Sequence, residues 1–141
     1  TRVRSSAASD VYKRQILYGG NGNGANVSSE TWTWNGTTWQ QRHVMGVPLE
    51  DQNASLVYDS VTQQTLLFGA ISSDATWIWN GTAWVNVATH GAPTAPFQGA
   101  SAYDDAAQSV IVYAGQGDVK TGTTPMSQTW IWNGTAWKLL R

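Results

Sequence analysis

Short runs in which bulky and polar residues alternate recur along the chain, and each run ends at small or turn-forming residues. Four such runs occupy residues 54–59, 65–70, 75–80 and 83–88. A period of two residues is typical of a strand with one face buried. No stretch sustains the 3.6-residue spacing of an amphipathic helix. The pattern therefore predicts an all-β fold of antiparallel strands with no helix.

The strongest pattern is a tryptophan-rich segment that occurs three times without gaps. It reads TWTWNGTTW at 31–39 and TWIWNGTAW at both 76–84 and 129–137, and together the three copies contain all 9 tryptophans. Asn-Gly between alternating bulky residues predicts a hairpin with a two-residue type I′ turn, in which both residues take positive φ. In the middle copy, this turn would place Trp77 opposite Trp84 and Trp79 opposite Thr82.

The repeat extends beyond the hairpin, and each full copy is predicted to form four strands. The first copy begins at Ile16 with its second strand, so we expect eleven strands, in blades at 16–42, 54–88 and 99–140. Both faces of such a sheet are apolar, so each copy must be covered by its neighbours. Four-stranded sheets that recur every ~40–50 residues and cover one another are the blades of a β-propeller. The tryptophans are then expected to pack between blades.

The predicted blades are too few for a closed ring, since propellers close with about 4–8 blades. Eleven strands amount to less than three full blades. The pattern therefore predicts a β-propeller fragment, whose partners include the remaining blades of the same parent chain.

Three motifs resemble those of kelch repeats. They are the pair Gly19-Gly20 after a hydrophobic strand, Tyr-Asp at 58–59 and at 103–104, and the W-x-W-N-G-T-x-W hairpin. Over about residues 16–141, the chain is similar to the bacterial kelch repeats that resemble the central domain of galactose oxidase. This resemblance implies the propeller fold. The copper-radical chemistry of that enzyme needs a cysteine crosslinked to a tyrosine, and this sequence has 0 cysteines, so no catalytic residue is carried over.

The first fifteen residues differ from the rest in charge. They hold four of the 8 basic residues and one of the 9 acidic ones. Residues 5–15 resemble the in-frame translation of a transposase adaptor used to prepare sequencing libraries, and the alternative is a native basic import leader. We expect residues 1–15 to be a non-native, disordered leader. Without them no basic stripe remains, which argues against nucleic-acid binding, and no apolar run is long enough for a membrane span.

Few side chains suggest catalysis or metal binding. His43 and His90 follow the hairpin tryptophan at different offsets and have no third ligand nearby in the sequence, so we expect surface histidines. A glycine-rich string at 19–25 fits a dinucleotide loop only if a helix follows, whereas a strand is expected. Three of the five Asn-x-Ser/Thr sequons, at Asn26, Asn35, Asn53, Asn80 and Asn133, are the hairpin asparagine. We therefore expect no catalytic residue, no metal and no cofactor.

The topology of the predicted blades suggests where a ligand would bind. In a four-stranded meander, the loops between strands two and three share one end of the sheet with the connectors to the next blade. These loops, at 21–29, 71–74 and 116–127, vary in length, as binding loops on a rigid scaffold do. The candidate ligand-binding residues at this end are His43, Asp74, His90, Asp118 and Lys120.

The predicted function is that of a non-catalytic binding or scaffold module for a protein or a glycan. The low charge and the abundance of Trp, Thr, Asn and Gly favour a bacterial protein that is secreted or on the cell surface. The alternative is part of a propeller enzyme, a copper oxidase or a carbohydrate-active one, with its catalytic residues in the missing blades. A purely structural spacer is a third possibility.

Overall fold

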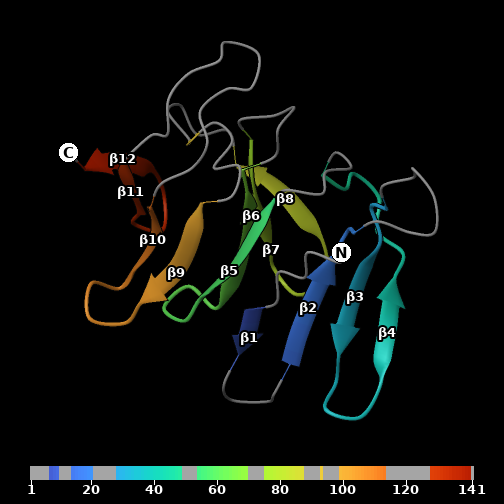
Figure 1. Cartoon of the computed structure of the whole chain (residues 1–141). Coiled ribbons are helices and arrows are strands. Elements are labelled where there is room, and N and C mark those ends of the chain that lie inside the picture. Colours follow the sequence, from blue (N-terminus) through green and yellow to red (C-terminus); the bar gives the residue numbers. More distant parts are fainter. Residues whose placement is uncertain are drawn as a thin grey trace.

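The computed structural model describes residues 7–9, 14–20, 28–48, 54–69, 75–87, 93, 99–113 and 128–140. Within these ranges the chain forms twelve strands and no helix, arranged as three antiparallel sheets of four strands (Figure 1). The strands are β1 (Ala7–Ser9), β2 (Arg14–Tyr18), β3 (Thr31–Trp34), β4 (Trp39–Arg42), β5 (Ser55–Asp59), β6 (Gln64–Phe68), β7 (Thr76–Trp79), β8 (Trp84–Val87), β9 (Ala100–Asp104), β10 (Ser109–Tyr113), β11 (Thr129–Trp132) and β12 (Trp137–Leu140).

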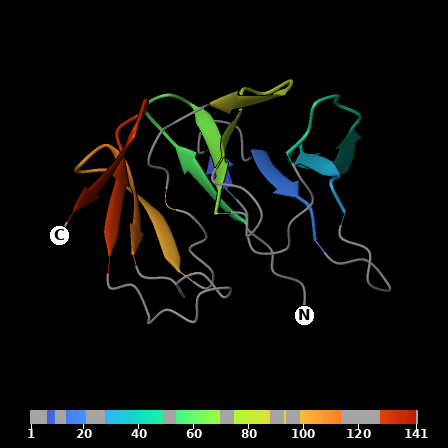
Figure 2. The same cartoon turned by 90° about the horizontal axis from the view of Figure 1, so that it is seen from above.

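Each sheet is a simple meander, in which strands that follow one another in the chain lie side by side. The first sheet contains β1–β4, the second β5–β8 and the third β9–β12. The first strands of the sheets lie nearest to one another, and the sheets spread from them like a fan, with the second sheet between the other two (Figure 2). The predicted all-β architecture of four-stranded antiparallel blades is confirmed.

The structure has one strand more than the sequence predicted. Strand β1 pairs with β2 through Ala7 opposite Ile16 and Ser9 opposite Arg14. It takes the place in the first sheet that residues 57–59 hold in the second. The expectation of disorder is therefore wrong for this part of the leader. The unpaired edge of β2 offers backbone donors and acceptors to any extended segment, and residues 7–9 carry no alternating pattern that the sequence analysis could have recognised.

The tryptophan hairpins form as predicted, but in a different register. Trp79 lies opposite Trp84, and the backbone N–H of Asn80 donates to the carbonyl of Ala83 at 3.2 Å. Positive φ falls on Gly81, at 101°, and not on the asparagine. The Asn80 side-chain oxygen instead accepts from the backbone N–H groups of Thr82 and Ala83, both at 3.0 Å. The predicted type I′ turn with Trp77 opposite Trp84 is therefore wrong.

The same asparagine arrangement recurs in the other two hairpins. Asn35 and Asn133 accept the corresponding pairs of backbone N–H groups, at 2.8–2.9 Å and at 3.0 Å. An asparagine side chain that accepts from the backbone two and three residues ahead closes the turn itself. The asparagine of the motif is thus required as a hydrogen-bond acceptor, and the glycine for its backbone conformation.

The turn between the first two strands explains the Tyr-Asp motif. The Oδ1 atom of Asp59 accepts from the backbone N–H of Val61 at 2.9 Å and from that of Thr62 at 3.1 Å. Asp104 makes the equivalent pair of bonds in the third sheet, at 2.9 and 3.0 Å. Each turn ends with a glutamine in the left-handed region. The φ angle of Gln63 is 56° and that of its counterpart is 49°, a conformation that costs a residue with a Cβ free energy.

We expect the substitution Gln63→Gly to raise the free energy of unfolding by about 1 kcal/mol, because glycine takes positive φ without steric cost. The adjacent Gln64, in β6, is the matched control. Gln64→Gly should lower that free energy by about 0.5–1 kcal/mol, since glycine in a strand loses more conformational entropy on folding. Urea denaturation of the two variants measures both effects. A loss of stability in Gln63→Gly would show that the turn is not strained there.

The core lies between the sheets, in two clusters. One joins the first and second sheets, and the other joins the second and third. The buried members of the first cluster are Ile16, Tyr18, Leu56, Leu67, Trp79 and Trp84. Those of the second are Val57, Leu66, Phe68, Ile78, Val110, Val112, Trp132 and Trp137. The second sheet thus buries both of its faces, which is the packing predicted for stacked blades.

The prediction that the tryptophans pack between blades holds for two sheets of the three. Trp84 and Trp137 are buried, with exposed fractions of 5% and 6%. Their counterpart in the first sheet, Trp39, is 41% exposed. Among the described strands no further sheet covers the outer face of the first one, so this tryptophan stays in contact with solvent.

Candidate functional site

The candidate site is the end of the sheets that carries the loops between the second and third strands and the connectors to the next blade. In the first sheet the loop leaves through Gly19 and Gly20, whose φ angles are 67° and 116°. The backbone N–H of Gly19 donates to the carbonyl of Glu30 at 3.0 Å, and that of Ser28 donates to the carbonyl of Gly20 at 2.9 Å. These bonds hold the two ends of the loop together.

A connector, residues 43–48, follows β4 and is anchored at this same end. The Tyr18 hydroxyl donates a buried hydrogen bond of 2.6 Å to the carbonyl of Pro48. Val44 and Val47 pack against the core cluster between the first two sheets. The connector is therefore fixed to the scaffold both by apolar contacts and by a buried hydrogen bond.

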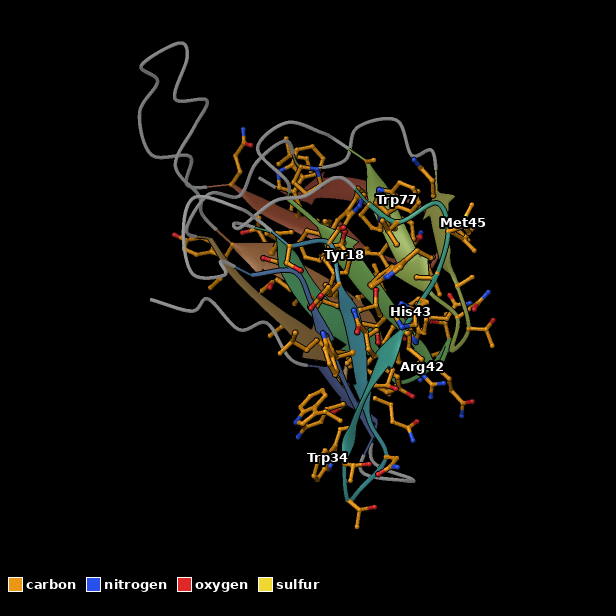
Figure 3. All side chains as sticks on the ribbon, turned by 90° about the vertical axis from the view of Figure 1, so that its right-hand side faces the viewer. Tyr18, Trp34, Arg42, His43, Met45 and Trp77 are labelled. Carbon is orange, nitrogen blue, oxygen red and sulfur yellow. The ribbon has the colours of Figure 1, made fainter. Side chains whose placement is uncertain are left out.

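Between its anchors, the connector presents side chains to solvent. His43 is exposed, and Met45 is 94% exposed. Figure 3 shows Arg42 and His43 where β4 ends, with Met45 farther along the chain. Val44, Val47 and Pro48 are the anchored residues of this segment, and the bend at Met45 and Gly46 between them is exposed. A loop that is held on both sides of an exposed bend presents the side chain at the bend in a fixed position.

Of the five predicted ligand-binding residues, one lies within the described part of the chain. His43 is on the surface of the connector, as expected for a binding-face residue and equally for a surface histidine. The other four lie outside the described residues: Asp74, His90, Asp118 and Lys120. Whether the five residues lie together, and their shared role in binding, therefore stay predictions.

The structure adds residues to this end that the sequence analysis did not select. Met45 is the most exposed of the large hydrophobic side chains of the described residues. No pattern in the sequence separates it from Val44 and Val47, the apolar residues of the same connector that pack against the core. Glu30 is exposed at the other margin, where its carboxylate accepts from the Trp32 indole N–H at 3.0 Å.

Arg42 is a positively charged residue of this end among those described. Its Nε donates to the Thr33 hydroxyl at 2.9 Å, and its Nη2 donates to the side-chain oxygen of Gln40 at 3.4 Å. All three side chains belong to the neighbouring strands β3 and β4, so the guanidinium lies along the sheet surface. Arg42, a cation held by neutral partners, thus precedes an exposed imidazole in the chain, and Met45 adds an exposed apolar side chain farther along the connector (Figure 3). Such a mixture suits recognition of a polar ligand with apolar parts.

The described residues contain no group of three or more His, Cys, Asp or Glu side chains that could hold a metal ion. The glycine-rich string begins at Gly19 and is followed by the strand β3 (Thr31–Trp34), so the helix that a dinucleotide site requires does not follow it within the described ranges. No helix in the described part of the chain is long and apolar enough to span a membrane. The arrangement here can present side chains, and it shows no catalytic constellation among the residues described.

Comparison with known proteins gives a likeness in structure and none in sequence. No family model matches the chain, and no curated protein is significantly similar to it in sequence. Among solved structures, the chain is similar to that of YjhT, with a TM-score of 0.70 and 8% sequence identity over 98% of this chain. The match covers 45% of the YjhT chain, so the present chain spans less than half the length of its structural neighbour. At this identity the likeness shows the fold alone, which is a β-propeller-like, all-β fold.

Proposed function

We propose that this chain is a kelch-like propeller module that binds a protein or a glycan, without catalysis, through the end that carries the variable loops and connectors. The observation that carries the proposal is the connector at 43–48. Val44, Val47 and Pro48 are fixed to the core, and the connector presents His43 and Met45 to solvent beside them. Burial of anchoring residues lowers the entropy that a binding loop must lose on complex formation.

The kelch-like assignment rests on the motifs and on the reasons that the structure supplies for them. The Asp of Tyr-Asp closes a turn, the first Gly pair takes positive φ, and the Asn-Gly pair closes the hairpin. The Asp turn recurs in the second and third sheets and the Asn-Gly hairpin in all three, at equivalent places, as repeat units require. A location outside the cell, on the surface of a bacterium, fits the low charge of 12% Asp, Glu, Lys and Arg, and it forms part of the proposal.

The alternative function is part of a propeller enzyme with its catalytic residues in other blades. No observation on the described residues favours it, since they contain neither a metal-ligand cluster nor a cysteine. A structural spacer would use the same scaffold without a ligand. The test below distinguishes a binding module from a spacer, because a spacer does not need an intact loop surface.

The test uses labelled protein against an array of bacterial and host oligosaccharides and against a displayed peptide library. For any probe that binds, we expect Met45→Ser to weaken affinity about 10-fold or more, as loss of a central apolar contact does. Val61→Ser is the matched control, because Val61 is 56% exposed in the β5–β6 turn, away from the connector. Its affinity should change less than about 2-fold. Ligand-induced NMR shifts confined to the Asn-Gly turns would contradict the proposed face.

A further inference from the structure

One contact joins the first and second sheets at their centre. The indole N–H of Trp84, in β8, donates to the hydroxyl of Thr31, in β3, at 2.9 Å, and the bond is buried. The same indole ring packs edge-to-face on Tyr18, with ring centroids 5.2 Å apart and an interplanar angle of 69°. The tryptophan of one sheet thus fits a socket that the preceding sheet forms from a threonine and an aromatic ring.

The same contact joins the second and third sheets. Trp137 donates to the hydroxyl of Thr76 at 2.9 Å, again buried, and packs edge-to-face on Phe68 at 4.8 Å and 62°. Every sheet therefore has two unlike faces. We call the one with the last-strand tryptophan the Trp face, and the opposite one, with the threonine and aromatic of the socket, the Thr face.

The first and third sheets each have one face that no other described sheet covers. One of these outer faces carries an unpaired tryptophan of this kind, and the other carries an unfilled socket. On the Trp face of the first sheet lies Trp39, 41% exposed and tilted against Trp34 at 5.6 Å (the latter is labelled in Figure 3). On the Thr face of the third sheet lie Tyr113, 54% exposed, and Thr129, half-buried. The register of β10 and β11 places these two residues directly opposite each other, as Tyr18 and Thr31 are in the first sheet.

Exposed apolar side chains gather on these outer faces. Trp39 lies on the outer face of the first sheet, and Tyr113 lies on that of the third. The outer face of the third sheet also carries Leu140, which is 37% exposed and lies opposite Thr129. Ile111 and Ile131 form the next row of the same Thr face and are only half-buried. Apolar residues that collect on one surface and match a surface elsewhere on the same molecule mark an interaction site.

We propose that two copies of this chain associate head to tail, with Trp39 of each copy in the socket that Tyr113 and Thr129 form in the other. The Trp face and the Thr face are unlike each other, so a contact between them is heterologous, and such contacts close into a ring when the rotation permits. The half of the contact that each outer face lacks is present on the other outer face, so a second copy of the chain fits both of them.

This association is independent of the proposed ligand-binding end. The two outer faces lie at opposite sides of the fan (Figure 2), and the contact uses the flat faces of the sheets. The connector at 43–48, which carries the proposed ligand contact, belongs to neither outer face, because its anchored residues pack between the first and second sheets. Failure of the association test would leave the proposed function untouched, and loss of binding by Met45→Ser would leave the association untouched.

The experiment is sedimentation velocity of the 141-residue chain over a series of concentrations. We expect a reversible dimer. A species that stays monomeric at about 100 µM, where a micromolar contact would be saturated, would overturn the proposal and would mean that something else covers these faces, such as further blades of a longer chain. Open chains of three or more copies would also overturn it, because the ring would then not close with two.

Two single variants test the contact from either side. Trp39→Ala removes the inserted ring, and Tyr113→Ala removes the wall of the socket. Each should weaken dimerisation about 30-fold or more, as is usual for a central aromatic contact. Val61→Ala, exposed but on neither face, should leave it unchanged. Circular dichroism verifies that each variant is folded. If Trp39→Ala does not fold, the dimerisation of Tyr113→Ala alone tests the proposed contact.

A mixture of the two variants tests the head-to-tail arrangement. The Tyr113→Ala copy keeps an intact Trp39, and the Trp39→Ala copy keeps an intact socket, so one good contact remains between unlike copies. We expect heterodimers at concentrations at which each variant alone is monomeric. If the mixture associates no better than the separate variants, the contact is not head to tail and the proposal is overturned.

Discussion

Replacing Trp137 with alanine is expected to lower the free energy of unfolding by about 3–5 kcal/mol, the usual cost of removing a large buried aromatic. The ring is 6% exposed. It contacts Phe68 edge-to-face and is tilted against Trp132 at 5.4 Å. Its N–H donates to Thr76 across the two sheets. The substitution therefore opens a cavity between sheets and also removes a buried hydrogen bond.

The matched control is the equivalent tryptophan of the first sheet. Trp39→Ala should cost only about 1 kcal/mol or less, because this ring is already in contact with solvent. Urea denaturation in dilute protein, where association between copies adds little, gives the comparison. Equal losses for the two variants would show that the repeated tryptophans stabilise the hairpins alone and not the contact between sheets.

The second large effect is expected for Thr31→Val. Valine has nearly the shape of threonine, but it cannot accept the indole N–H of Trp84, which is buried beside it. A buried donor that loses its acceptor costs about 1–3 kcal/mol. Thr31→Ser should recover part of this loss, because serine keeps the hydroxyl. The measurement is again the free energy of unfolding from urea denaturation.

Thr129→Val is the control for the threonine. Thr129 occupies the equivalent place in the third sheet, and among the described residues no tryptophan from a following sheet reaches it. Its replacement should change the free energy of unfolding by less than about 0.5 kcal/mol in dilute protein. A cost equal to that of Thr31→Val would mean that the hydroxyl serves within its own sheet, and the explanation by the indole bond would be wrong.

Local signals in the sequence predicted most of the strands correctly. Strands β5 and β7 begin within one residue of the expected positions and end within one residue of them. This accuracy has a physical reason. A strand with alternating exposure, bounded by turn residues, records its own surroundings in its pattern.

The errors occurred where the sequence leaves more than one local solution. Asn-Gly is compatible with a type I′ turn, but here the Asn80 side chain accepts from two backbone N–H groups. The partner of each β7 residue in β8 therefore lies two residues farther along the chain than predicted. Strand β1 carries no alternation, and it forms because β2 has an open edge. The end of the sheets at which the candidate site lies could be predicted, because the order of strands in a meander places these loops and connectors together. The exposure of Met45 could not, because it depends on a hydrogen bond between residues 18 and 48, which are distant in the sequence.

Neighbours a few residues apart are enough to specify the repeat, the hairpins, the turn residues and the tendency of the tryptophans to pack against another sheet. Which of the tryptophans are buried depends instead on tertiary packing. The nine-residue segments at 76–84 and 129–137 are identical, yet they stack on different sheets, and the near-identical segment at 31–39 faces solvent with Trp39. Burial depends on what lies across the face of a sheet, and that is set by residues about fifty positions away in the chain.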